Sequence, residues 1–326
     1  MPCFLGIDVS KAKLDAALLL SSGKFKSKVF ANDAAGFSTL VQWLAQHAPD
    51  AYAAAHICME ATGSYHEAVA CFLSDQGFML SVVNPLLVKR FSQASGQRNK
   101  TDAADAKCLA QFCQTHQPQR WQAPSVAVRA LQALVARLEA LQLMRQAECN
   151  RLDVAHSSVA SSVRQVISDL DAAIAQIKAQ IARTMDDDPD LKQRAALLNS
   201  IPGLGDRTIP QLLAYIGRPE RFKSVKALSA FASLSPLIRQ SGSSLNSHRG
   251  THGMGHQQLK RALYFPAMVA ARFNPLVAVF WNRLKAQNKP GKVIVVACMH
   301  KLLSIAFGVL RSGKPFDPNH LAKTTA

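Results

Sequence analysis

The chain has 326 residues, enough for two domains that each bury a core. Its seven cysteines are odd in number and lack C-x-x-C spacing, which argues against a disulfide scaffold or a structural zinc site. The net charge of +17 is concentrated at one end, because residues 191–326 hold 20 Lys/Arg and only 3 Asp/Glu. This excess favours a nucleic-acid partner over a generically basic soluble domain.

We expect a cytoplasmic protein with no membrane partner. Asp8 and Lys11 interrupt the apolar run near the N-terminus, unlike in a signal peptide. The most apolar later stretch, Val293 to Leu310, contains His300 and Lys301 and is short for a span of about 20 residues. We interpret it as a core helix, and the cysteines as small buried thiols in a reducing compartment.

The first part of the chain alternates strand and helix patterns. Strands are expected at 3–9, 14–20, 24–30, 56–59 and 78–83, and helices at 36–46, 65–72, 87–91 and 101–114. Three strands, helix, strand, helix, strand, helix is the order of an RNase H-like α/β domain. The segment from Gln117 to Pro124 is rich in Pro and Gln and is expected to be a linker, with Trp121 as its anchor.

The middle of the chain is expected to be helical from Val128 to Thr184. Its apolar residues recur at heptad-like spacing, which weakens between Cys149 and Ser162. This pattern predicts two long helices with a break between them. A helical hairpin within one chain and a coiled coil between chains both fit it.

The basic part contains a glycine-rich turn between two helical patterns. The turn, Ile201 to Gly205, follows the helical Ala195 to Leu198 and precedes Leu212 to Ile216. Such a helix-hairpin-helix offers backbone N–H groups to a phosphate. We therefore expect Gly203 and Gly205 to contact nucleic acid.

A polar, glycine-rich stretch follows, and it contains Ser241 among Arg239, His248 and Arg249. Serine needs activation to act as a nucleophile at neutral pH, and neighbouring cations can stabilise charge on a phosphate. From spacing alone a flexible polar loop is the favoured interpretation. His248, His252 and His256 recur every four residues, but intervening glycines argue against a helix that would make them metal ligands.

Four carboxylates are candidates for one metal site. Asp8 and Glu60 interrupt apolar strands, where an unpaired charge is costly. Asp102 and Asp105 are three apart at a helix start and so share a face, although acidic residues there are also favoured by the helix dipole. Oxygen ligands of this kind suit Mg²⁺, which can clamp both oxygens of a phosphodiester under attack.

Together these motifs resemble one family, the bridge-RNA-guided insertion-sequence recombinases, which are DEDD transposases related to the Piv invertase. The resemblance spans nearly the whole chain. It is carried by Gly6 to Lys11, Met59 to Gly63, Val83 to Pro85, Asn99 to Ala106, Ile201 to Gly205, Ser241-Gly242 and Leu259 to Leu263. One departure is Ile209-Pro210, which stands where the hairpin motif usually has small residues.

The resemblance implies a RuvC-like domain, a coiled-coil insertion and a transposase domain, which we place at 1–124, 125–190 and 191–326. It implies Mg²⁺ bound by Asp8, Glu60, Asp102 and Asp105, and Ser241 as a nucleophile that links covalently to DNA. Because Ser243 and Ser244 are close to Ser241 in the sequence, which of the three serines is the nucleophile stays open. It also implies donor and target DNA, a structured guide RNA, and a homo-oligomer, dimer to tetramer, in which one protomer's carboxylates work with another's serine. Further nucleic-acid contacts are expected at Arg239, Arg249, Lys260 and Arg261.

Three other functions fit parts of the sequence. A RuvC-like junction endonuclease would use a metal-activated water and no serine. An actin-like sugar kinase would use Gly6 to Ser10 as a phosphate-binding start, although we find no second phosphate loop and the basic third does not suit it. The third is a non-catalytic RNA- or DNA-binding protein, which DNA rearrangement retained after Asp8→Asn or Glu60→Gln would favour over catalysis.

Overall fold

The computed structural model describes residues 3–61, 65–96, 101–241, 245–251 and 255–319, and within 236–251 it describes only the backbone. The chain divides into two compact units, residues 1–123 (unit 1) and 124–326 (unit 2). Each unit has a hydrophobic core of its own.

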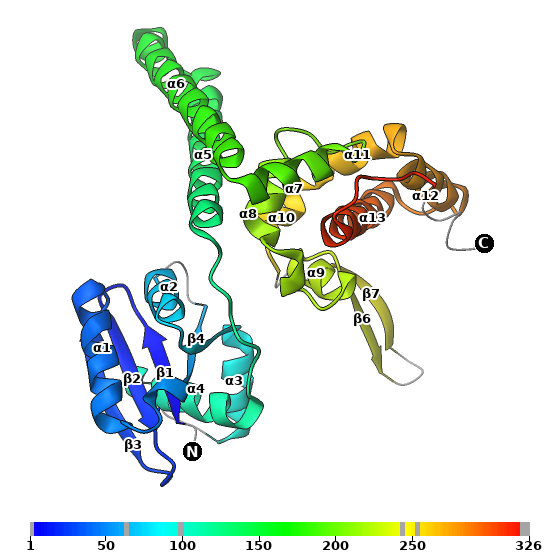
Figure 1. Cartoon of the computed structure of the whole chain (residues 1–326). Coiled ribbons are helices and arrows are strands. Elements are labelled where there is room, and N and C mark those ends of the chain that lie inside the picture. Colours follow the sequence, from blue (N-terminus) through cyan, green and yellow to red (C-terminus); the bar gives the residue numbers. More distant parts are fainter. Residues whose placement is uncertain (1–2, 62–64, 97–100, 242–244, 252–254, 320–326) are drawn as a thin grey trace. The chain divides into compact units, whose positions relative to one another are not determined.

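Unit 1 is built on a mixed sheet of five strands in the order β3-β2-β1-β4-β5 (Figure 1). The strands are β1 Phe4–Val9, β2 Lys13–Leu19, β3 Phe25–Ala31, β4 His56–Glu60 and β5 Met79–Val83. The first three pair antiparallel as a meander, and β4 and β5 join parallel to β1. This is the RNase H-like arrangement that the element order predicted.

Helices cover both faces of this sheet. They are α1 Ala34–His47, α2 Glu67–Asp75, α3 Pro85–Ala94 and α4 Asp102–His116, with a 3₁₀ turn, η1 Tyr52–Ala54. Leu5 and Ile7 of β1 pack with α1 and α2, whereas Phe4 packs with α3 and α4. Successive side chains alternate between the faces of a strand, so Gly6 and Asp8 belong to the α4 face with Phe4.

The linker after α4 is fastened to the sheet. The Trp121 backbone N–H donates to the Leu80 oxygen at 2.6 Å, and the indole packs against the core under α1 and α2. Ser81 Oγ lies 3.0 Å from the carbonyl oxygens of Pro118 and Gln119, and His56 Nε2 lies 2.8 Å from the same hydroxyl. The expected anchor at Trp121 is confirmed.

Unit 2 begins with two long helices, α5 Val126–Leu152 and α6 Ser157–Asp187. They pack against each other along their length and turn between Asp153 and His156, inside the stretch where the heptad pattern weakens. Arg145 Nε donates to Asp171 Oδ1 across the pair at 2.5 Å. The two helices and their break are confirmed, and within the chain they form a hairpin.

The rest of unit 2 is mostly helical. Its elements are α7 Pro189–Asn199, α8 Ile209–Ile216, η2 Pro219–Arg221, α9 Val225–Phe231, β6 Pro236–Ser241, β7 Leu245–Thr251, α10 Gln257–Ala262, α11 Tyr264–Phe273, α12 Pro275–Ala286 and α13 Gly291–Ser312. The stretch expected to be a flexible polar loop is instead a two-stranded antiparallel hairpin, β6–β7. The polar side chains did not predict these strands, because the hydrogen bonds of the ladder are made by backbone groups.

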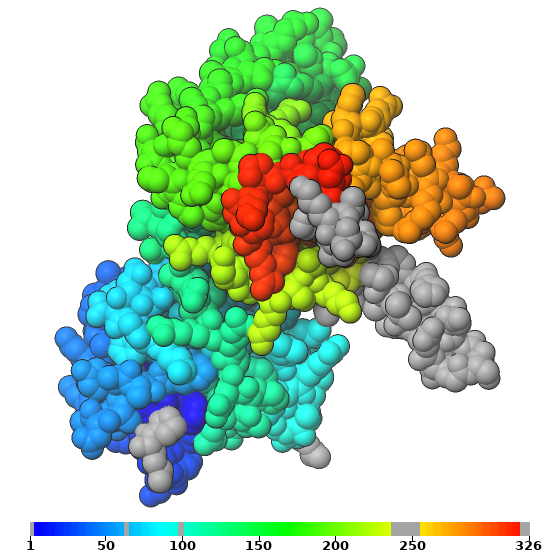
Figure 2. Space-filling model, turned by 45° about the vertical axis from the view of Figure 1, so that its right-hand side comes forward, coloured from blue at the N-terminus to red at the C-terminus, as the bar shows by residue number. Residues whose placement is uncertain are grey.

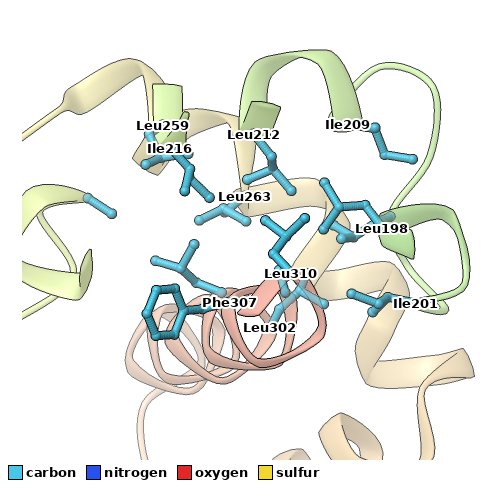
Figure 3. Packing of buried hydrophobic residues seen from close by; sticks show 14 of the residues in the cluster. Leu198, Ile201, Ile209, Leu212, Ile216, Leu259, Leu263, Leu302, Phe307 and Leu310 are labelled. Carbon is cyan, nitrogen blue, oxygen red and sulfur yellow. The ribbon is translucent and has the colours of Figure 1, made fainter. Parts of the chain in front are cut away.

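The core of unit 2 surrounds α13 (Figure 3). Leu302, Phe307 and Leu310 of this helix meet Leu198 of α7, Leu212 of α8 and Leu263 of the turn between α10 and α11. The helix is long and apolar enough to cross a membrane, but 56% of its most apolar window is buried inside the unit. Around α12, orange in Figure 2, unit 2 instead exposes apolar side chains such as Phe273 and Val279.

Candidate active site

Asp8 and Glu60 are brought side by side by the pairing of their strands. In the parallel ladder Ile7 of β1 stands opposite Met59 of β4, so the next residues, Asp8 and Glu60, are neighbours at the same sheet edge. Alternation also places both side chains on the α4 face, because Ile7 and Met59 pack on the opposite one. The two carboxylates predicted from interrupted strands therefore meet.

Gly6 brings α4 onto the same part of the sheet. A Cβ at Gly6 would lie 2.0 Å from the Ala106 oxygen and 2.5 Å from the Ala110 nitrogen, so the helix backbone rests directly on β1. Asp102 and Asp105 stand on the first turn of this helix, which Thr101 caps by accepting from the Ala104 N–H at 3.2 Å. Only glycine permits this close approach.

Burial and the neighbouring carboxylates together change the acidity of Asp8. Burial raises the pKa of Asp8, and the negative charges of Glu60, Asp102, Asp105 and Asp15 raise it further, to about 6. The first three of these are the predicted partners of Asp8. The structure therefore brings all four predicted carboxylates into one electrostatically coupled group.

Asp15 is a fifth carboxylate that the sequence reasoning missed. It lies directly opposite Asp8 in the β1–β2 ladder and is only 8% exposed. Like charges placed opposite each other destabilise a sheet, so this pair needs a compensating cation. The signal was present in the sequence, because a hairpin closed between Ser10 and Lys13 sets Asp8 against Asp15.

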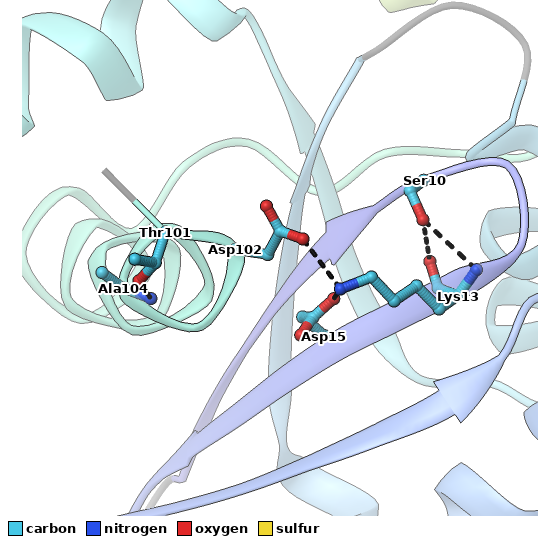
Figure 4. A network of polar contacts seen from close by, with 6 residues as sticks. All are labelled: Ser10, Lys13, Asp15, Thr101, Asp102 and Ala104. Atoms are coloured by element: carbon cyan, nitrogen blue, oxygen red, sulfur yellow. Dashed lines mark hydrogen bonds and ion pairs between the residues drawn. The ribbon is translucent and has the colours of Figure 1, made fainter. Parts of the chain in front are cut away.

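That cation is supplied by Lys13 (Figure 4). Its Nζ lies 3.0 Å from Asp15 Oδ2 and 2.8 Å from Asp102 Oδ2, so one ammonium joins β2 to the start of α4. These two bonds raise the pKa of Lys13, which keeps it charged. Nothing in the sequence around Lys13 singles out this lysine.

In donor chemistry the cluster suits a hard divalent cation, because all its ligands are carboxylate oxygens and their mutual repulsion would be relieved by one. The present positions of these side chains, however, do not form a set of metal ligands. Among the described residues, no three His, Cys, Asp or Glu side chains are grouped so that they could hold a metal ion as they stand. One Asp102 oxygen is instead bonded to Lys13.

Ser241 is the last residue of β6, where its backbone pairs with Leu245 across the hairpin. Ser243 and Ser244 lie outside the described residues. Arg239 is paired with Ser247, and Arg249 with Leu237, within the same ladder. The structure thus places Ser241 at the hairpin's turn end, with two arginines on the strands behind it.

The base of this hairpin is held by a polar clasp, which we define as the buried Ser233 and the half-buried Gly255 and His256. Ser233 has a left-handed backbone, φ 54°, and its Oγ accepts from the Gly255 N–H at 2.8 Å. The His256 N–H donates to the Phe231 oxygen at 2.6 Å, and its ring caps α10 by accepting from the Leu259 N–H. A Cβ at Gly255 would lie 2.5 Å from that Phe231 oxygen, so the two ends of the hairpin meet tightly.

Comparison with known proteins supplies the family. A model described as a transposase, of the DEDD type, matches residues 5–155, and one described as the transposase IS116/IS110/IS902 family matches residues 195–282. The pilin gene-inverting protein of Moraxella bovis is 33% identical over 316 residues, which cover 96% of this chain and 97% of that protein. The chain belongs to the IS110 family of DEDD transposases. The pilin gene-inverting protein of Moraxella lacunata matches equally well, and a 43.6 kDa protein of insertion element IS110 from Streptomyces coelicolor is 28% identical over 166 residues, 51% of this chain and 39% of its own length.

Membership of this family makes the protein a DNA recombinase, with DNA as its substrate. DEDD transposases typically use divalent metal ions, in keeping with the donor chemistry around Asp8. The sugar kinase and the non-catalytic binding protein no longer fit.

In this IS110-family transposase the glycine turn does lie between two helices, α7 and α8. Gly203 has φ 105°, and a Cβ there would lie 2.6 Å from the Ala270 side chain, so it packs against α11. Gly205 has open space around it and is exposed. Ile209 and Pro210, which depart from the usual small residues of the motif, are buried at the start of α8, so their larger side chains pack in the core.

A cavity of about 960 Å³ opens beside this turn, between the α5–α6 hairpin and the α10–α11 segment. Its lining includes four cationic residues, Lys178, Lys192, Arg207 and Arg261, and two aspartates, Asp186 and Asp206, of which Asp186 pairs with Lys192 at 3.7 Å. Because cations exceed carboxylates, we call it the basic groove. Of the expected nucleic-acid contacts, Arg261 lines it, and Lys260 precedes Arg261 on α10. The groove offers several cations to one phosphate backbone.

Proposed function

We propose that this transposase cuts and rejoins DNA at a site where Asp8, Glu60, Asp102 and Asp105 hold Mg²⁺ and Ser241 is the nucleophile. The observation that carries the proposal is the coupling of these four carboxylates around Asp8 in a member of a DEDD family. A bound divalent cation would supply positive charge to the phosphate oxygens under attack. We infer further that residues 1–124 are RuvC-like, 125–190 a coiled-coil insertion and 191–326 the transposase domain.

In the proposed step, Ser241 Oγ attacks the phosphorus of the DNA backbone and the bond from phosphorus to one sugar oxygen breaks. The serine proton leaves to solvent, and the departing sugar oxygen takes up a proton. The product is a phosphodiester between serine and one DNA end. A sugar hydroxyl of the new partner strand then attacks the same phosphorus and restores the serine, so the number of phosphodiester bonds is conserved.

The test of the nucleophile is to trap the protein–DNA adduct and map it by mass spectrometry. We expect it on Ser241, and we expect Ser241→Ala to abolish both adduct and recombination. Ser243→Ala and Ser244→Ala are matched controls that should retain both. Strand cleavage that persists in Ser241→Ala without any adduct would instead support the junction endonuclease.

The test of the carboxylates is metal binding by calorimetry, with strand cleavage measured in parallel. Asp8→Asn and Glu60→Gln should lose both metal binding and cleavage, because each removes a charged oxygen ligand. Asp50→Asn removes an exposed carboxylate elsewhere in unit 1 and should lose neither. Undiminished metal binding and cleavage in Asp8→Asn would contradict the site.

We propose that a structured guide RNA selects donor and target DNA by base pairing. The support is the charge of residues 191–326 and the resemblance to the RNA-guided family; the basic groove adds a surface that suits a phosphate backbone. Sequencing the RNA that co-purifies with the protein tests this directly. One enriched, structured RNA is expected, and RNA no different from background would refute the guide.

We also propose a homo-oligomer, dimer to tetramer, that acts in the cytoplasm and completes each site from two protomers. Mixing Asp8→Asn protein with Ser241→Ala protein tests the sharing. Each variant is inactive alone, and the mixture should recover activity if carboxylates and serine come from different chains. An inactive mixture of correctly assembled protein would show that each chain uses its own pair.

A further inference from the structure

We propose that Lys13 is a built-in cation that occupies Asp102 in the metal-free protein and must leave it when a divalent cation binds. The inference rests on the metal site proposed above. It concerns a residue outside the four expected ligands, and it makes Lys13 a positioning residue that sets how tightly the site holds its metal.

The first support is that the Lys13 backbone cannot move away from the cluster. Ser10 Oγ donates to the Lys13 oxygen at 2.9 Å and accepts from the Lys13 N–H at 3.2 Å. Figure 4 shows these two bonds of the Ser10 hydroxyl, and the Ser10 N–H also donates to the Lys13 oxygen at 3.0 Å. Lys13 is therefore fixed at its main chain while its four-carbon stem stays free to redirect the ammonium.

The second support is that the two partners of Lys13 differ in how firmly they hold it. The Asp15 side chain is 10% exposed and stands within the sheet, whereas the Asp102 side chain is 55% exposed at the first residue of α4. An exposed ion pair is weak and is easily exchanged. Lys13 can therefore release Asp102 and remain bonded to Asp15.

The third support is competition for one oxygen. Lys13 Nζ lies 2.8 Å from Asp102 Oδ2, and a metal bound at that oxygen would bring two positive charges into contact. In the metal-free protein the same ammonium offsets repulsion within the carboxylate cluster. Lys13 therefore substitutes for the metal and opposes its binding.

The experiment is calorimetric titration of the full-length protein with Mn²⁺ and Mg²⁺, together with melting temperatures in chelator and in metal. Lys13→Met keeps the stem and removes the charge. We expect it to bind the metal roughly twofold to fivefold more tightly, the worth of one exposed ion pair. Its melting temperature should fall in chelator and recover with metal. Lys11→Met, which removes an exposed charge from the same turn, is the matched control and should change affinity little.

Affinity in Lys13→Met that equals the Lys11→Met control, or that is weaker than in the unaltered protein, overturns the inference. Lys13→Gln, whose stem still packs while its amide carries no charge, repeats the test if the Met variant does not fold by circular dichroism. Failure of the proposed function itself would be seen differently. The unaltered protein would bind no metal, or Asp8→Asn would bind it as well as the unaltered protein does.

Discussion

The contact between Gly6 and α4 predicts that one methyl group will disorganise the carboxylate cluster. Replacing Gly6 with Ala puts a Cβ 2.0 Å from the Ala106 oxygen and 2.9 Å from the Leu109 Cβ. Real Cβ contacts are not shorter than 3.0 Å, so α4 must retreat by at least about 1 Å. Overpacking of this kind costs about 1–3 kcal/mol of the free energy of unfolding.

The retreat carries Asp102 and Asp105 away from Asp8, because both stand on the first turn of α4. A displacement of about 1 Å can lower a catalytic rate by about 100-fold. We expect Gly6→Ala to lose recombination by roughly that factor while the protein stays folded.

Urea unfolding and a recombination assay measure the two effects in the same preparation. Gly308→Ala is the control, because Gly308 is an exposed position inside α13 with open space around it. That substitution should stabilise the protein by about 0.5–1 kcal/mol and leave recombination unchanged. A Gly6→Ala protein as stable and as active as the unaltered one would refute the packing argument.

Three further predictions concern other parts of the molecule. The pKa of Asp8 is raised to about 6, above its ordinary 3.8, so the folded metal-free protein should lose stability as pH rises from about 4 to 6. In unfolding curves the stability of Asp8→Asn should depend less on pH, and this variant should be more stable than the unaltered protein at pH 7. Ser233→Ala leaves the partly buried Gly255 N–H without its acceptor and should lower the free energy of unfolding by about 1 kcal/mol, with recombination falling at unchanged metal affinity. Arg261→Gln should lower the slope of log affinity against log salt by about 1 in a nucleic-acid binding assay. The control is Lys314→Gln, at an exposed position outside the basic groove, which should leave the slope unchanged. Unaltered pH dependence, stability or salt slope, respectively, would contradict each.

The sequence was enough to predict the order of strands and helices in unit 1, because most strands there are apolar runs bounded by turn signals, and the polar β3 follows the turn at Ser21 to Gly23. It also singled out Asp8 and Glu60, since a charge inside such a run is costly wherever the run packs. Their meeting followed from the parallel pairing of β1 and β4, which the element order implied.

The features that the sequence did not reveal depend on contacts between distant segments. Lys13 looks like any surface lysine until α4 is packed beside β2, since its partner Asp102 is 89 residues away. The β6–β7 strands are polar and carry no apolar alternation, so only the closed ladder identifies them. The clasp likewise joins Ser233 to Gly255 across 22 residues.

The fastening of the linker to the sheet determines where the chain can be divided. A fragment that ends at Ala123 keeps the carbonyl oxygens of Pro118 and Gln119 for the buried Ser81 hydroxyl, and the Trp121 N–H for the Leu80 oxygen. A fragment that stops at the end of α4 loses all of these partners and exposes the core where the indole packs. Residues 118–121 are therefore a structural part of unit 1, and only the few residues up to the Ser125 cap of α5 remain as the connection to unit 2.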